Sequence, residues 1–231
     1  MGSLIAAALA RAQGFLLEPA VDLEPPPLAA VPAPVEARGP VHVVVTGLSR
    51  GSGATTIASG LTQALVVPGA RSAHLVSLRP HAGGGRCGPR GVVAWEQPPA
   101  RWNADEVADY GATLARIAAG GGEAAVVWDV RADDAARAAR VMEECDAVVC
   151  VADGSAEPAL CTLVCDMLAE RYGRVLLVAN RVRDEESWSG RCAVAVPESR
   201  LAAMLIGRGR AVGGVVAAAM SRIAALAEEQ T

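Results

Sequence analysis

VHVVVTGLSRGSGATT, residues 41–56, places a β-branched apolar run, a glycine-rich turn and the start of a helix in direct succession. The run 41–46 has the composition of a buried strand. Gly51 and Gly53 permit a positive φ and a close approach of the backbone. The amides of residues 51–55 are therefore expected to converge on one anion site at a helix N-terminus. The segment predicts a phosphate-binding P-loop, and an ordinary Gly/Ser turn that caps a helix is the alternative it leaves open.

Strands and helices alternate along the rest of the chain. The strands are expected at residues 41–46, 74–78, 123–130, 147–152, 174–180 and 192–196. The helices are expected at residues 54–66, 105–119, 133–144, 158–170, 199–206 and 212–229. This alternation predicts a three-layer α/β domain with a doubly wound, mostly parallel sheet and helices on both faces. Ligands of such sheets bind at the carboxyl ends of the strands, where the glycine-rich turn lies.

The N-terminal forty residues differ in composition from the rest. Residues 1–17 are rich in Ala and Leu and predict a short leader helix, in which Arg11 is the one basic residue. Residues 18–40 hold seven prolines and predict an extended linker. The folded domain is expected over residues 41–231. Docking of the leader on a protein partner, peripheral membrane contact through residues 2–17, and a loosely ordered leader are all open.

The charge composition excludes one kind of mechanism. All 21 basic residues are Arg, so no step can depend on a lysine. The net charge is −4 and no basic block stands out, so general nucleic-acid binding is not indicated. Aromatic residues make up 3% of the chain, which also disfavours platforms for base stacking.

The location and the cysteines fit a reducing compartment. No secretory signal and no uninterrupted apolar run of membrane-spanning length is present, so a cytoplasmic protein is expected, with a peripheral position at the inner face of the membrane as a variant. The six cysteines are interpreted as small buried apolar residues. Cys161 and Cys165 are four residues apart, a spacing that suits a metal, but no His lies near them.

Several isolated polar and aromatic residues have structural interpretations. His42 and His74 lie on expected strands as core or edge residues, and Asp133 with Asp134 is expected to cap the next helix. Trp188 lies in a polar run, which leaves a partner surface open for it.

The glycine-rich loop resembles that of the ParA/MinD family of deviant Walker-A ATPases, K-G-G-x-G-K-[ST]-[ST]. Aligned on Gly53 and Thr55, the phosphate lysine of the family falls on Ala54, and its second, dimer-bridging lysine falls on Ser49. Arg50 falls on a family glycine. The resemblance implies an ATP site with degenerate charge chemistry. Its cofactor-binding residues would be Arg50, Gly51, Ser52, Gly53, Ala54, Thr55, Thr56, Asn180 and Arg181.

Later motifs follow in the order of the family. Asp129 ends an expected strand and is similar to the Walker-B aspartate, so a magnesium ion would be held by Thr55 and Asp129. Asn180 with Arg181 resembles an N-[RK] pair whose Asn contacts adenine. Residues 77–80, SLRP, keep the proline of a D-x-D-P motif without its acids. The closing P-E/D and G-x-x-V pattern is similar to residues 196–198 and 207–212.

A narrower resemblance is to the TadZ/CpaE-like and septum-site-determining branch, whose loop is similar to R-G-x-G-A-[ST]-T. Residues 50–56, RGSGATT, fit that pattern. The glycine cluster at 83–85 and the segment 91–95, GVVAW, look similar to a glycine cluster and a G-x-x-W segment of that branch. The short leader departs from the receiver-like domain that such proteins often carry.

The resemblance implies a homodimeric positioning or scaffold protein of a pilus/secretion or septation assembly, with weak or absent ATP hydrolysis. The alternative is a functional ATPase of chromosome or plasmid partitioning or of division-site selection. That alternative requires Arg50 to replace the lysines, and its DNA contacts could come only from Arg200, Arg208 and Arg210. A third class is a binder of another anion at the same loop.

Overall fold

The structure is a computed structural model that describes residues 41–66, 72–78, 92–96, 98–120 and 124–229. The expected leader helix, the proline-rich linker, the second half of the SLRP motif and the glycine cluster lie outside the described residues. The same is true of Cys87 and His81.

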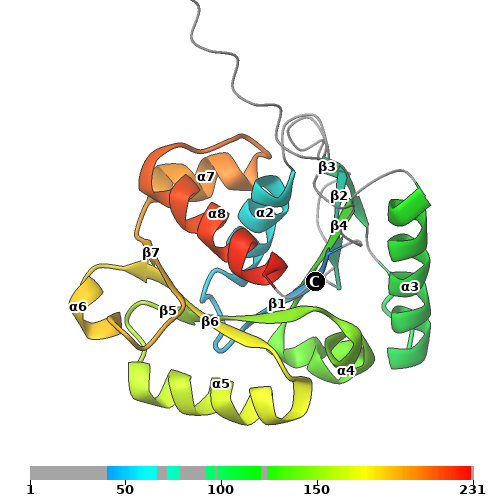
Figure 1. The fold of residues 1–231 in the computed structure, drawn as a ribbon, viewed down its shortest axis with the longest axis horizontal. Coiled ribbons are helices and arrows are strands. Elements are labelled where there is room, and N and C mark those ends of the chain that lie inside the picture. Colours follow the sequence, from blue (N-terminus) through cyan, green and yellow to red (C-terminus); the bar gives the residue numbers. More distant parts are fainter. Residues whose placement is uncertain (1–40, 67–71, 79–91, 97, 121–123, 230–231) are drawn as a thin grey trace, which may run out of the picture. The chain divides into compact units, whose positions relative to one another are not determined.

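Seven parallel strands form one sheet in the order β3-β2-β4-β1-β5-β6-β7 (Figure 1). The strands are β1 Val41–Gly47, β2 Ser72–Ser77, β3 Val92–Glu96, β4 Ala124–Val130, β5 Ala147–Asp153, β6 Val175–Val182 and β7 Val194–Pro197. β1 lies at the centre, between β4 and β5. The segment that follows β1 therefore starts at the carboxyl edge with strands on both sides, which is where ligands of open α/β sheets bind.

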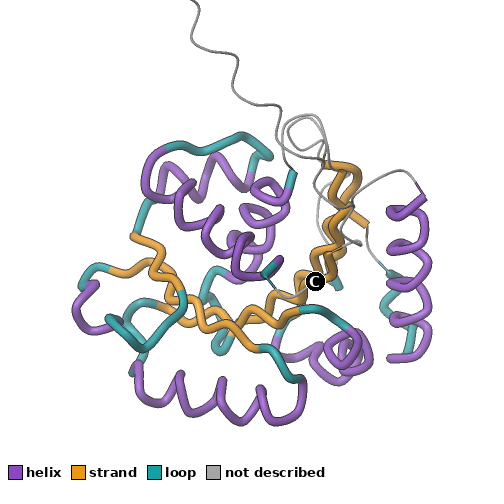
Figure 2. Tube along the Cα trace, in the orientation of Figure 1, coloured by secondary structure: helices purple, strands orange, loops and turns teal. Residues whose placement is uncertain are grey.

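Helices cover both faces of the sheet, as Figure 2 shows. On one face lie α2 Ala54–Leu65, α7 Arg200–Gly207 and α8 Gly214–Glu228. On the other lie α3 Ala104–Gly120, α4 Ala135–Glu144 and α5 Pro158–Tyr172. Alternating residues of β1 divide between the two cores, with Val43 and Val45 in the first and Val44 in the second. The predicted three-layer α/β architecture is confirmed.

Two short elements were not predicted from the sequence. β3 is an edge strand of five residues that follows a glycine-rich stretch and precedes two prolines, and α6 Glu185–Trp188 is a single turn that Asp184 caps through its carboxylate. A periodicity cannot be detected over so few residues. The hypothesis that Trp188 marks a partner surface is wrong, because this side chain is buried and its Nε1 donates to the carbonyl of Gly154 at 3.1 Å.

Other expectations at single residues have mixed outcomes. Asp134 stands at the N-cap position of α4 without capping it through its side chain, because its carboxylate accepts from Arg131 Nε at 2.9 Å. His42 and His74 do lie on strands, as predicted. Among the described residues, no helix combines the length and the apolar character needed to cross a bilayer.

Candidate functional site

The loop between β1 and α2 has the backbone of an anion cradle. Gly51 and Gly53 have φ angles of 78° and 89°, in the left-handed region that the sequence predicted for them. The amide of Leu48 donates to the carbonyl of Val151 at 2.9 Å, which fixes the start of the loop on β5. Gly53 is the N-cap residue of α2 and supplies no side chain to its first turn. The first amides of α2 therefore remain available to an anion.

The loop is held from the neighbouring strand β6. Asn180 Nδ2 donates to the carbonyl of Ser52 at 2.8 Å. A Cβ on Gly53 would lie 2.1 Å from that same nitrogen, so the close approach of Asn180 requires glycine for space as well as for its φ. Gly47 is constrained in a similar way, since a Cβ there would lie 2.5 Å from Ser52 Oγ.

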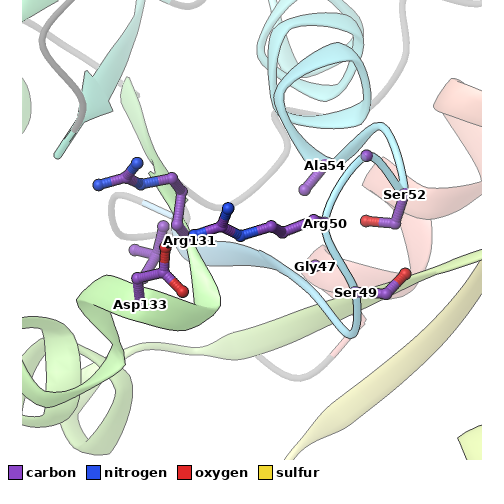
Figure 3. Close-up of a pocket in the computed structure, with 9 residues that line it drawn as sticks. Gly47, Ser49, Arg50, Ser52, Ala54, Arg131 and Asp133 are labelled. Atoms are coloured by element: carbon purple, nitrogen blue, oxygen red, sulfur yellow. Dashed lines mark hydrogen bonds and ion pairs between the residues drawn. The ribbon is translucent and has the colours of Figure 1, made fainter.

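A cavity of about 280 Å³ opens in front of this loop. It is lined by Gly47, Ser49, Arg50, Gly51, Ser52, Ala54, Val130, Arg131 and Asp133. Figure 3 shows the Arg50 side chain stretching from the loop toward Asp133. Its Nη2 lies 3.2 Å from Asp133 Oδ2. The side chain of Arg50 is 92% exposed, so it lies at the rim of the cavity rather than within the cradle.

The oxygen ligands expected for a magnesium ion meet at one point beside the loop. Thr55 Oγ1 donates to Asp129 Oδ1 at 3.2 Å, and Ser77 Oγ donates to Asp129 Oδ2 at 3.4 Å. These side chains come from the start of α2 and the ends of β4 and β2. Hydroxyl and carboxylate oxygens are ligands that Mg²⁺ accepts, so Thr55 and Asp129 fit this ion.

Arg181 fastens the loop from outside. It is the one non-glycine residue with a positive φ, 62°, in the part of the chain that the structure describes. Its Nη2 donates to the carbonyl of Gly51 at 2.6 Å and also pairs with Asp153. The guanidinium is therefore engaged with the back of the loop.

A second hollow of about 450 Å³ adjoins Arg181. Its lining residues are Asp153, Gly154, Ser155, Arg181, Arg183, Asp184 and Glu198. Arg183 Nε donates to Glu198 Oε2 at 2.6 Å, and this bond holds the pKa of the Glu198 carboxyl below its usual value. The hollow is thus lined by paired charges rather than by apolar side chains.

The predicted site residues are brought together, but they divide between two places. Arg50, Gly51, Ser52 and Ala54 line the first cavity, while Asn180 and Arg181 lie on β6 on the far side of the loop. Thr56 turns away from the cavity and lines a small apolar pocket with Ile57 and Met220. The sequence analysis assigned no ligand-site role to four side chains of the region, Ser77, Arg131, Asp133 and Asp153. Ser77 was noted only in place of a missing acid of the D-x-D-P motif and Asp133 only as a helix cap, while Arg131 and Asp153 fall at no motif position.

Solved structures share this architecture. A ParA family ATPase from Chlorobium tepidum TLS matches with a TM-score of 0.55 at 13% identity over 80% of this chain and 98% of that one. The MinD cell division protein of Aquifex aeolicus matches with a TM-score of 0.57 at 15% identity, over 80% and 95%. The MinC:MinD cell division protein complex of the same organism gives 0.56 at 14%, over 80% and 94%. No protein-family model and no curated protein matches the sequence.

The chain therefore has the ParA/MinD fold, as its sequence predicted. Identities of 13–15% show the fold alone, so the chemistry of the site has to be argued from its own residues.

Proposed function

We propose that this chain is a positioning or scaffold protein with a degenerate nucleotide site, which serves a pilus/secretion or septation assembly and hydrolyses ATP weakly or not at all. The observation that carries the proposal is the presence of alanine at position 54. Its methyl group lines the cavity at the position where the related loops place the phosphate lysine, and the chain has no lysine to substitute for it.

The effect of the missing lysine on ATP binding can be calculated approximately. A charge-assisted hydrogen bond contributes about 1.5–3 kcal/mol, so one missing lysine weakens binding of ATP by about 10- to 150-fold. The effect on the rate of hydrolysis is expected to be larger, because negative charge on the transferred phosphoryl group has to be stabilised in the transition state. Ser49 removes a second cation from the same cradle.

The remaining parts of the site support weak binding rather than none. The first amides of α2 can contact phosphate oxygens, and Thr55 with Asp129 can hold a magnesium ion, which would shield phosphate charge. Asn180 and Arg181 hold the loop through its carbonyls at Ser52 and Gly51. ATP with magnesium is therefore the ligand to test first.

Arg50 is the residue on which the rival function depends. A functional ATPase for partitioning or division-site selection needs a cation over the phosphates, and Arg50 does line the cavity. Its guanidinium is paired with Asp133 at the rim, however, which favours the scaffold proposal.

The decisive experiment restores the cation. We expect Ala54→Lys to bind ATP·Mg at least about 10-fold more tightly than the natural chain in isothermal titration calorimetry. Ala54→Met is the matched control, because it adds a chain of similar length without charge and should bind like the natural protein. Asp129→Asn in the Ala54→Lys background should remove the magnesium dependence of the gain. Micromolar affinity and steady phosphate release by the natural chain would overturn the proposal.

Partners belong to the same proposal. The MinD protein of Aquifex aeolicus is solved in a complex with MinC, which supports a protein partner for this fold. The homodimer is proposed from the resemblance of the loop alone. The TadZ/CpaE-like loop pattern favours a pilus/secretion or septation machine. A cytoplasmic protein with peripheral membrane contact through residues 2–17 is tested by cell fractionation, in which deletion of those residues should shift the protein to the soluble fraction.

A further inference from the structure

Large apolar side chains are exposed on two helical faces that do not line the cavity in front of the loop. Six such side chains are exposed among the described residues, and all of them lie on α5, on α7 or at the start of α8. The exposed fractions are 59% for Leu160, 57% for Leu163, 63% for Met167, 63% for Leu201, 44% for Met204 and 71% for Val215. Scattered exposed apolar residues need no explanation, but six confined to two places indicate contact surfaces.

The α5 face is apolar with an acidic edge. Leu160, Leu163 and Met167 are spaced i, i+3, i+7 and so form one stripe, while Cys161 and Cys165 on the inner side of α5 pack into the core. Asp166 and Glu170 are exposed one turn apart beside the stripe. The basic residue of this helix, Arg171, is already held by Glu143 at 3.4 Å, so the open charge is negative.

The α7 face is apolar with a basic edge. Leu201 and Met204 lie one turn apart on α7, and Val215 lies in the first turn of α8 after a short connection. The exposed side chains of Arg200, Arg208 and Arg210 accompany them. Residues 199–215 contain three Arg and no acidic residue in a chain whose net charge is −4. The α5 face and the α7 face thus complement each other in charge as well as in apolar character.

The two faces lie on opposite sides of the sheet. α5 packs in the core cluster that contains Val44, whereas Ala202 and Ile206 of α7 pack in the cluster that contains Val43. Figure 1 shows α5 and α7 with the sheet between them. When the α5 face of one molecule meets the α7 face of another, the remaining two faces point away from each other. Such a contact is heterologous, so it adds further molecules instead of closing a pair.

We propose that copies of this chain associate head to tail, with the α5 face of one molecule on the α7 face of the next, into an open-ended row. The contact involves three large apolar side chains from each side and an attraction between acidic and basic edges. It is a small interface, so the association is expected to be weak and to grow with protein concentration. It does not use the nucleotide loop and does not rest on the proposed function.

The α5 face and the α7 face can be tested one at a time. Analytical ultracentrifugation of the natural chain should show a sedimentation coefficient that rises between about 5 μM and about 500 μM, and less so as salt is raised. Leu163→Glu blocks the α5 face and Leu201→Glu blocks the α7 face, and neither variant alone should grow with concentration beyond the proposed homodimer. Ala112→Glu on the exposed side of α3 is the matched control and should assemble like the natural chain. Circular dichroism and the melting temperature establish that each variant is folded.

Mixing the two blocked variants gives the sharpest result. Each retains one working face, so a 1:1 mixture should associate beyond what either variant shows alone. If either variant alone assembles like the natural chain, or if the mixture sediments like the separate variants, the head-to-tail contact is wrong. A natural chain whose sedimentation coefficient does not rise over the whole concentration range also overturns it. Assembly should be the same with and without ATP·Mg and in Ala54→Lys, so its outcome is independent of the test of the nucleotide site.

Discussion

Buried polar groups lie at both ends of the strands, which form the amino edge and the carboxyl edge of the sheet. The groups at the two edges differ in their surroundings. At the amino edge, the amide of His42 donates to Asp146 Oδ2 at 2.6 Å and the amide of Asp146 donates to the carbonyl of His42 at 2.8 Å. Trp128 Nε1 donates to His42 Nε2 at 2.6 Å. At the carboxyl edge, Thr55 and Ser77 converge on Asp129 beside a cavity.

The difference separates polar groups that serve the fold from those that suit a ligand. The amino edge is closed, and burial there raises the pKa of the neighbouring Cys145 thiol to about 12. The carboxyl edge opens onto a cavity that the glycine loop lines, and the buried carboxylate of Asp129 lies beside it. That geometry is present in a chain that contains no lysine. The backbone of the loop is therefore maintained by packing against β6, and it does not need a phosphate-binding lysine to exist.

At the carboxyl edge, the substitution with the largest expected effect on stability is Gly53→Ala. The new Cβ would lie 2.1 Å from Asn180 Nδ2 and would impose a positive φ of 89° on an L side chain. Backbone strain of about 1–3 kcal/mol and the loss of the bond from Asn180 to Ser52, about 0.5–1.5 kcal/mol, should together lower the free energy of unfolding by about 2–4 kcal/mol. Chemical denaturation measures it.

Gly51→Ala is the matched control for that substitution. Its φ of 78° imposes a similar strain, but a Cβ there meets nothing within 4 Å. It should therefore destabilise the protein clearly less than Gly53→Ala. Equal effects of the two substitutions would show that Asn180 does not hold the loop.

The sequence predicted the carboxyl edge better than the amino edge. A β-branched run, two glycines and a helix start are local signals, and they located the loop, Thr55 and Asp129 at strand ends where parallel topology brings them together. The contacts of His42 with Trp128 and Asp146 join residues 86 and 104 positions apart, and no local pattern indicates such partners. The prediction of a partner surface at Trp188 was wrong for the same reason. Its polar neighbours in the sequence do not indicate that its side chain bonds to Gly154.

The roles of charged residues were harder to predict than their places. Arg181 was expected among the cofactor-binding residues because of its motif, and in the structure its guanidinium donates to the carbonyl of Gly51. Arg50 was expected at the loop, where it does lie, but its partner Asp133 is 83 residues away. Long side chains choose partners by tertiary proximity, and a single sequence does not give that proximity.

The role of His42 at the amino edge is tested by how the stability of the protein responds to acid. Burial lowers the pKa of His42 below its ordinary value of 6.5, while the charge of Asp146 acts against that shift. The folded protein holds His42 neutral, as an acceptor for Trp128 Nε1, so the unfolded chain binds more protons at low pH. Stability contributed by neutral His42 is complete above pH 6.5 and is lost as the pH falls below it, with a slope of at most about 1.4 kcal/mol per pH unit.

The measurement is urea denaturation of the natural chain and of His42→Gln at several pH values between 7.5 and 5. Carboxylates contribute to both proteins, so the part due to His42 is the difference between the two slopes. Natural protein and variant with the same slope through pH 6 would contradict the assignment. Trp128→Phe removes the donor and leaves the burial, so it should retain most of the His42 slope.

The smallest expected effect distinguishes the rim of the cavity from its cradle. Arg50 is almost fully exposed and paired with Asp133, and exposed ion pairs contribute little to stability, so Arg50→Ala should leave the melting temperature unchanged within error. It should also leave ATP·Mg binding unchanged in calorimetry, because the guanidinium points to a carboxylate rather than to the cradle amides. Asp133→Ala makes the comparison informative, since it releases Arg50. A gain in affinity in Asp133→Ala that disappears when Arg50→Ala is added would show that Arg50 can act as a phosphate cation only after its partner is removed. A loss of affinity in Arg50→Ala alone would instead place this residue in the cradle of the natural protein and favour the ATPase.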